Sequence, residues 1–158
     1  MSGRTRHIQG DPGLPGVEEY QAASELREAL RRFHRHSEQV ARRHRLTPQR
    51  YELLLMIKAA RAGDEKASMG ELAERLHHAS STLSELVQRA EALGLVRREP
   101  GTTRGSRGRT YVRLTSEGED RLAGAVADLA EDRRRLIAIL SQLSPSEPAR
   151  RAPARKRK

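Results

Sequence analysis

Two short helical segments joined by a tight turn place the strongest constraint on the fold of this chain. In the first segment, SMGELAERL, Ser68 and Glu71 have the spacing of a capping box, and the apolar residues share one helical face. The second segment begins at Ser80 or Ser81, one of which we expect to be its N-cap, and Gly94 ends it. This pattern predicts a helix-turn-helix.

The polar face of the second segment indicates what it could contact. Short hydroxyl side chains would let the helix enter a DNA major groove, whereas Gln88 and Arg89 are long enough to reach base edges or phosphates. Glu85 could accept a hydrogen bond from a cytosine amine or only pair with Arg89, and the whole face also fits an ordinary solvated helix. The predicted recognition residues are Ser80, Ser81, Thr82, Ser84, Glu85, Gln88 and Arg89.

A glycine- and arginine-rich loop follows this helix. The segment TYVRLT, in which Val112 and Leu114 alternate with polar neighbours, predicts a strand after the loop, and LVRRE predicts one before it. A hairpin directly after a recognition helix would be a wing, and its arginines could enter a narrow minor groove, where the negative potential favours them. The alternative is a solvated hairpin. The predicted wing contacts are Arg98, Arg104, Arg107 and Arg109.

Overall charge supports a polyanionic partner. The chain has 31 Lys and Arg against 21 Asp and Glu, a net charge of +10, which points to nucleic acid or an anionic membrane surface, although a biased genome would also enrich arginine. No apolar run approaches the length of a membrane span and no signal-peptide pattern opens the chain, so we expect a cytoplasmic location.

Several classes of chemistry have no support in the residues. The chain has no cysteine, which excludes disulfides, thiolate catalysis and cysteine-based zinc sites. The pairs His34/His36 and His77/His78 do not share a helical face, so we expect no metal site. Because no phosphate-binding loop, Ser/His/Asp order or pair of carboxylates is evident either, we expect neither an enzyme nor a cofactor.

The C-terminal segment predicts a long helix with a heptad seam. After LTSEGEDRL the apolar residues recur in alternating steps of four and three until a proline, Pro145, stops the helix. A charged residue interrupts the seam once, which is typical of a device that fixes register or partner. The stripe would pair with a second copy of the chain, or pack on its own first helix, or do both. The predicted seam residues are Leu122, Val126, Leu129, Arg133, Leu136 and Leu140.

Taken in order, LTPQRYELLLMI, SMGELAERL, SSTLSELVQRAEALGLVRRE and YVRLTSEGEDRL resemble the MarR family of winged-helix transcriptional regulators over residues 46–122. The resemblance implies a homodimer that binds pseudo-palindromic promoter DNA, and in many members release by a small phenolic or similar ligand. The family's Asp-x-Arg motif in the wing falls here on Ser106 and Gly108, so the bracing pair is absent, and Arg107 is the first choice for minor-groove insertion.

The expected fold class is mainly α with a small β wing: a winged helix-turn-helix domain plus dimerisation helices from both termini. Its parts are a flexible N-terminal arm (1–16), an N-terminal dimerisation helix (17–45), the DNA-binding domain (46–115), a C-terminal dimerisation helix (116–144) and a basic tail (145–158). In the DNA-binding domain, Thr47 would cap a helix that starts at Pro48 and forms the buried centre.

The resulting hypothesis is a sequence-specific DNA-binding transcriptional regulator, with repression as the expected effect. Its partners would be double-stranded DNA, a second copy of the chain and a small aromatic or phenolic effector. The alternative is a nucleoid-type or protein-interaction winged-helix module that touches DNA without sequence preference.

Overall fold

The computed structural model describes residues 15–61, 64–102, 105 and 107–143. They form two units: a terminal unit, which holds the chain up to Phe33 and from Arg133 on, and a winged-helix unit, His34–Asp132. The tail expected over 145–158 and residues 1–14 of the expected arm lie outside the described residues. None of the helices in the described part of the chain combines the length and the apolar content that crossing a bilayer requires.

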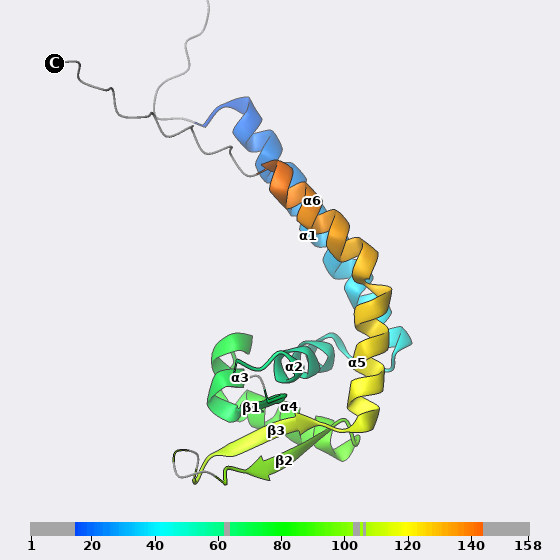
Figure 1. Ribbon diagram of the computed structural model, residues 1–158. Helices are drawn as coiled ribbons and strands as arrows, with labels where there is room; N and C mark the ends of the chain where they lie inside the picture. Colours follow the sequence, from blue (N-terminus) through cyan, green and yellow to red (C-terminus); the bar gives the residue numbers. More distant parts are fainter. Residues whose placement is uncertain (1–14, 62–63, 103–104, 106, 144–158) are drawn as a thin grey trace, which may run out of the picture. The chain divides into compact units, whose positions relative to one another are not determined.

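The winged-helix unit contains a small sheet and a group of short helices (Figure 1). The strands have the order β1-β3-β2, and both pairs are antiparallel. The prediction of a mainly α fold with a small β wing is confirmed, but only two strands were expected. The elements of the chain are α1 (Val17–Arg43), α2 (Pro48–Lys58), β1 (Lys66–Ser68), α3 (Met69–Leu76), α4 (Ser80–Ala92), β2 (Val96–Pro100), β3 (Thr110–Leu114), α5 (Ser116–Asp128) and α6 (Ala130–Leu143).

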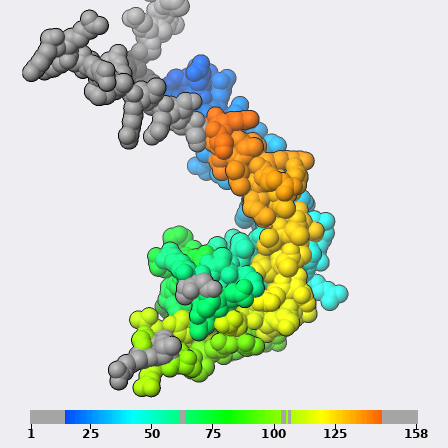
Figure 2. Space-filling view, in the orientation of Figure 1, coloured from blue at the N-terminus to red at the C-terminus, as the bar shows by residue number. Residues whose placement is uncertain are grey.

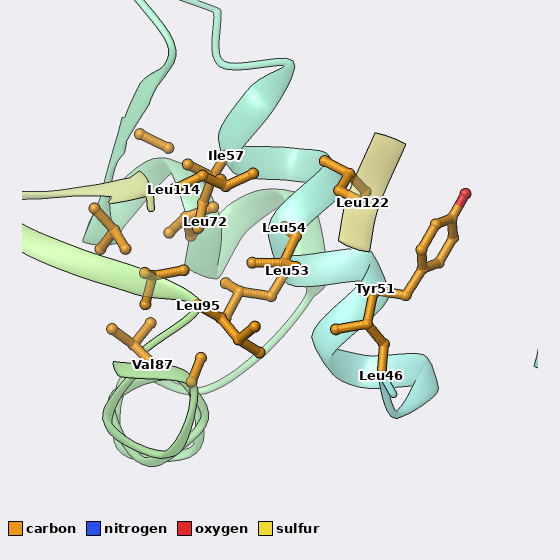
Figure 3. Packing of buried hydrophobic residues seen from close by; sticks show 14 of the residues in the cluster. Leu46, Tyr51, Leu53, Leu54, Ile57, Leu72, Val87, Leu95, Leu114 and Leu122 are labelled. Atoms are coloured by element: carbon orange, nitrogen blue, oxygen red, sulfur yellow. The ribbon is translucent and has the colours of Figure 1, made fainter. Parts of the chain in front are cut away.

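Helix α2 lies at the centre of the core, as predicted. Its Leu53, Leu54 and Ile57 are completely buried, and Figure 3 shows them among Leu72 of α3, Leu95 and the other apolar side chains of the unit. Burying one such side chain contributes roughly 1.5–3 kcal/mol, so this helix anchors the unit. Helix α4 and strand β3, which belong to the candidate DNA-binding face, both contact it.

The predicted caps are confirmed at two helices, at Thr47 and Ser68, and wrong at one; Thr115 is a further cap that the sequence analysis did not name. Thr47, Ser68 and Thr115 each accept a hydrogen bond from a backbone N–H in the first turn, at 3.3, 3.2 and 3.1 Å. Helix α4 instead begins after Ala79, with no capping side chain, so the prediction of a serine cap is wrong. The turn is set by the end of α3, where His77 has the left-handed φ of 52° and its N–H bonds back to the helix.

The single C-terminal helix expected over 116–144 is two helices, α5 and α6, separated at Leu129. The side chain of Leu129 is completely buried and belongs to the core of the winged-helix unit, as does Leu122, while Val126 packs against that core. The first half of the predicted seam is therefore used inside this chain. At Leu129 the backbone leaves the helical conformation, with φ −89° and ψ 1°.

In the terminal unit, the first half of α1 and the main part of α6 lie side by side (Figures 1 and 2). Of the α1 residues in this unit, Ala29 is buried and Phe33 is half-buried. Several large apolar side chains nevertheless remain on the surface of this two-helix unit, which indicates a face that another surface could cover. They are Val17, Tyr20, Leu30, Ile137 and Leu140, with exposed fractions of 72, 62, 43, 57 and 38%.

Candidate nucleic-acid interface

Helix α4 presents the face that the sequence predicted. Leu83, Val87 and Ala90 are buried against the core, so the opposite side of the helix is open to solvent. Because Ala79 is the N-cap, the hydroxyls of the first serines are not engaged in capping. All predicted recognition residues are exposed: Ser80, Ser81, Thr82, Ser84, Glu85, Gln88 and Arg89.

Of the two alternatives for Glu85, the structure shows the pair within the helix. Its carboxylate lies 3.2 Å from Nη2 of Arg89, and both side chains are about two-thirds exposed. An exposed pair of this type stabilises a helix by only about 0.3–0.5 kcal/mol. The pair can therefore open at little cost if either side chain finds a stronger partner.

The start of α2 adds residues that the sequence analysis missed. A groove of about 430 Å³ runs between this helix start and α4, and Gln49, Arg50 and His78 line it together with part of the α4 face. The N-terminus of a helix favours anions, and Arg50 adds a full positive charge there. The segment LTPQR gave the signal, because it places Gln49 and Arg50 in the first turn after a cap.

The wing is the hairpin of β2 and β3, at an edge of the winged-helix unit (Figure 2). The N–H of Gly101 donates to the carbonyl of Arg109 at 2.9 Å, which closes the loop end of the ladder, and Gly108 has a positive φ of 81°. Arg107 and Arg109 are exposed. Arg104, the remaining predicted contact in the loop, lies outside the described residues.

Arginines at the base of the wing are paired with a carboxylate. Glu99 of β2 lies 3.0 Å from Nε of Arg97 and 3.6 Å from Nε of Arg113 on the neighbouring strand. Arg113 also donates to the backbone carbonyl of Asp64 at 2.9 Å. Glu99 therefore ties the two strands of the hairpin together and offsets part of their positive charge.

Arg98, a predicted DNA contact, lies against α4 instead of extending into solvent. Its Nη2 donates to the carbonyl of Ser84 at 3.4 Å, and its Nε is 3.6 Å from a carboxylate oxygen of Glu91. The other oxygen of Glu91 accepts the backbone N–H of Arg98 at 3.3 Å. The wing and the recognition helix are thus connected through one arginine and one glutamate.

Two His–Asp pairs connect the end of α1 to α5 and α6. His44 Nε2 lies 2.9 Å from Asp128, and His36 Nδ1 lies 3.0 Å from Asp132. The hydrogen bond from His44 lowers the pKa of Asp128 below its ordinary value of 3.8; desolvation opposes this, and nearby positive charges add to it. Within the described ranges, no three His, Asp or Glu side chains are grouped as metal ligands.

Comparisons with known proteins point to one family. The model of the MarR family matches residues 45–105, and no curated protein sequence matches the chain. AbsC, a MarR family transcriptional regulator from Streptomyces coelicolor, is 23% identical with a TM-score of 0.64; the match covers 84% of this chain and 85% of that one. Sco3205, a MarR family regulator from the same organism solved in complex with DNA, is 25% identical with a TM-score of 0.61, covering 86% and 82%. MepR of S. aureus, also solved with DNA, is 18% identical with a TM-score of 0.58, covering 83% and 88%.

The family match begins just before α2 and ends in the loop of the wing, so it spans the helix-turn-helix and the elements that hold it. The solved relatives extend the likeness in fold to the terminal helices, since they cover more than four-fifths of the chain. Residues 45–105, which hold the helix-turn-helix and strand β2, match the MarR family, and the chain shares its fold with solved MarR family transcriptional regulators.

Proposed function

We propose that this regulator binds a pseudo-palindromic promoter site as a homodimer and represses transcription there. One observation carries the proposal: the exposed, mainly small and polar face of α4 lies between the basic start of α2 and the wing. A helix with small side chains can enter the major groove deeply, and the neighbouring basic elements then meet the flanking phosphates.

Within this arrangement, Gln88 and Arg89 would read base edges, and the hydroxyls of the first turn of α4 would contact the groove wall. Arg107 and Arg109, both exposed, would follow the backbone into the minor groove, with Arg107 as the inserted residue. Arg50, from the groove beside α4, joins this set as a phosphate contact.

The second copy of the chain would cover the apolar side chains exposed on the terminal unit. Tyr20 and Ile137 are more than half exposed there, which is unusual for residues of their size unless they are covered in the assembly. Leu136 and Leu140 continue the predicted seam beyond the winged-helix core, with Arg133 at its start. A two-fold dimer would place two α4 helices on successive turns of DNA, about 34–36 Å apart.

Release by a small aromatic or phenolic ligand completes the proposal, and its support is the family resemblance. Titration of such compounds into a preformed complex would test this part separately. A compound that binds the protein but leaves DNA affinity unchanged would contradict it.

The central experiment is a comparison of specific and random DNA. Genomic fragments retained by the full chain would be sequenced, and affinity for the enriched site would be measured against a random duplex of equal length at physiological salt. A specific regulator should prefer its site by roughly a thousandfold or more. A ratio near one would refute this function and favour a module that binds DNA without sequence preference.

A further inference from the structure

Glu91 occupies an unusual place for an acidic residue near a DNA-binding face. It lies in the last turn of α4, and both of its carboxylate oxygens contact Arg98 of β2. One oxygen accepts a hydrogen bond from the backbone N–H of Arg98, and the other lies near its guanidinium group. Strand β2 is an edge of the sheet, since the order is β1-β3-β2. Glu91 therefore supplies an acceptor to an edge strand and pairs with its side chain.

The side chain of Arg98 extends this contact along α4. While Nε faces Glu91, Nη2 reaches the carbonyl of Ser84, which is seven positions earlier in the helix. Seven residues correspond to about 10 Å along a helix axis, so the contact covers two turns. Because Ser84 belongs to the predicted recognition face, the same arginine touches the reading helix and forms part of the wing.

The hairpin itself is tied together by Glu99, which faces arginines on both strands. A movement of β2 relative to α4 would therefore carry the whole wing with it. The polar contacts of Glu91 and Arg98 oppose such a movement at the outer edge of the hairpin.

This pair contributes little to the stability of the fold. The side chains of Arg98 and Glu91 are 39% and 40% exposed, and pairs exposed to this degree typically contribute about 0–1 kcal/mol. A variant that lacks the carboxylate should fold normally. A loss of DNA affinity in such a variant would then report on geometry and not on unfolding.

We propose that Glu91 is a positioning residue for DNA recognition: it holds Arg98 and β2 against α4, so that the recognition helix and the wing meet DNA in a fixed relation. The inference rests on the proposed function and adds a residue to it. The main role of Arg98 would then be to connect α4 with strand β2 of the wing.

Electrostatics and positioning predict opposite effects for the loss of this carboxylate. DNA is a polyanion, so replacing Glu91 by glutamine makes the protein surface more positive and by charge alone strengthens binding. Stronger binding is also expected if Arg98 only contacts a phosphate, because the substitution removes the carboxylate that pairs with its guanidinium group. Loss of a fixed geometry instead weakens binding to the specific site and leaves binding to random DNA unchanged or stronger.

The test uses the full chain, the genomic site enriched by the wild type, and a random duplex. We expect Glu91→Gln to lower affinity for the site about tenfold, which is about 1.4 kcal/mol, without lowering affinity for the random duplex. Glu52→Gln is the matched control, because Glu52 is an exposed glutamate on α2 and its replacement changes the charge equally. Arg98→Lys keeps the charge but not the two-point contact, and should resemble Glu91→Gln.

Each result has a separate meaning. If Glu91→Gln binds the site as tightly as Glu52→Gln, or Arg98→Lys binds like the wild type, the positioning role is refuted while the function stands. If the wild type itself does not discriminate between the site and the random duplex, the proposed function fails and the role of Glu91 fails with it. Thermal unfolding of each variant, expected within about 4 °C of the wild type, checks that the fold is intact.

Discussion

Replacement of Gly118 by alanine is expected to destabilise the winged-helix unit, although alanine is the best helix former. Gly118 lies buried in the first turn of α5, and a Cβ atom added there would be 2.0 Å from the carbonyl oxygen of Leu95 and 3.0 Å from its carbon. Both are backbone atoms, so neither can rotate away. The same oxygen accepts the N–H of Thr115 at 3.1 Å, which further fixes the approach of α5 to this residue.

The magnitude follows from the size of the clash. To reach even the 3.0 Å that real Cβ atoms respect, the separation must grow by about 1 Å. Overpacking of this kind costs about 1–3 kcal/mol and occasionally more, and contact with backbone places Gly118 at the upper end. The gain in helix propensity, about 1 kcal/mol, offsets part of this. We expect a net loss of about 2 kcal/mol, or about 4–8 °C in Tm.

Urea unfolding followed by circular dichroism would measure this loss, with Gly70→Ala as the control. Gly70 is an exposed residue in the first turn of α3, and its added Cβ would meet nothing closer than 4.0 Å. That variant should gain about 0.5–1 kcal/mol. Equal stability of Gly118→Ala and the wild type, or a gain like that of Gly70→Ala, would show that the close approach to Leu95 is wrong.

Three further predictions concern pH, DNA and assembly. Because the pKa of Asp128 is lowered in the folded chain, its stabilising contribution is present above about pH 4 and is lost as the pH falls through the folded pKa. The difference in unfolding free energy between the wild type and Asp128→Asn should thus shrink from pH 7 to pH 3, and a constant difference would contradict this. Arg107→Ala should weaken binding to every duplex and reduce the salt slope by about 0.9, whereas an unchanged slope would exclude a phosphate contact. Ile137→Glu should give folded monomers in sedimentation. Leu129→Glu should instead unfold the chain, because Leu129 is completely buried. If Ile137→Glu still forms a dimer, the dimer interface lies elsewhere.

Features that depend on neighbours in sequence could be predicted, whereas features that depend on distant contacts could not. The cap at Thr47 and the αL glycine at Gly94 follow from local hydrogen bonding and backbone preference, and both are present. Strand β1 has only three residues and no alternation long enough to read. It forms because β3 offers it an edge, with Ala67 opposite Val112 in the core.

The break at Leu129 has the same explanation. The heptad spacing continues across Leu129, so the sequence predicted one helix. Such spacing shows which residues are apolar, but it does not show against which part of the structure they are buried. In the structure, Leu122 and Leu129 are buried in the winged-helix core, so the apolar side chains still exposed on the C-terminal helices lie beyond them.

At the candidate interface, helical periodicity was sufficient to predict which side of α4 is exposed, but counting arginines overstated the free positive charge. Arg97, Arg98 and Arg113 all lie within 4 Å of a carboxylate. Those carboxylates, Glu91 and Glu99, are distant in sequence from at least one arginine that they meet, so only the packing of α4, β2 and β3 brings them together.

The pairing with carboxylates distinguishes arginines that attract DNA from arginines that fix the geometry of the interface, which the sequence alone does not do. An arginine held by a carboxylate and a backbone carbonyl has a defined position, and its charge is partly cancelled before DNA arrives. Arg107 and Arg109, exposed in the loop beyond the last strand pair, are placed to supply attraction, whereas Arg98 is placed to supply geometry. Since affinity from phosphate contacts carries no sequence information, discrimination between sites has to come from base contacts of α4, and these depend on how α4 and the wing are held relative to each other. The carboxylate that fixes this relation is therefore expected to matter more for specificity than any single exposed arginine of the loop.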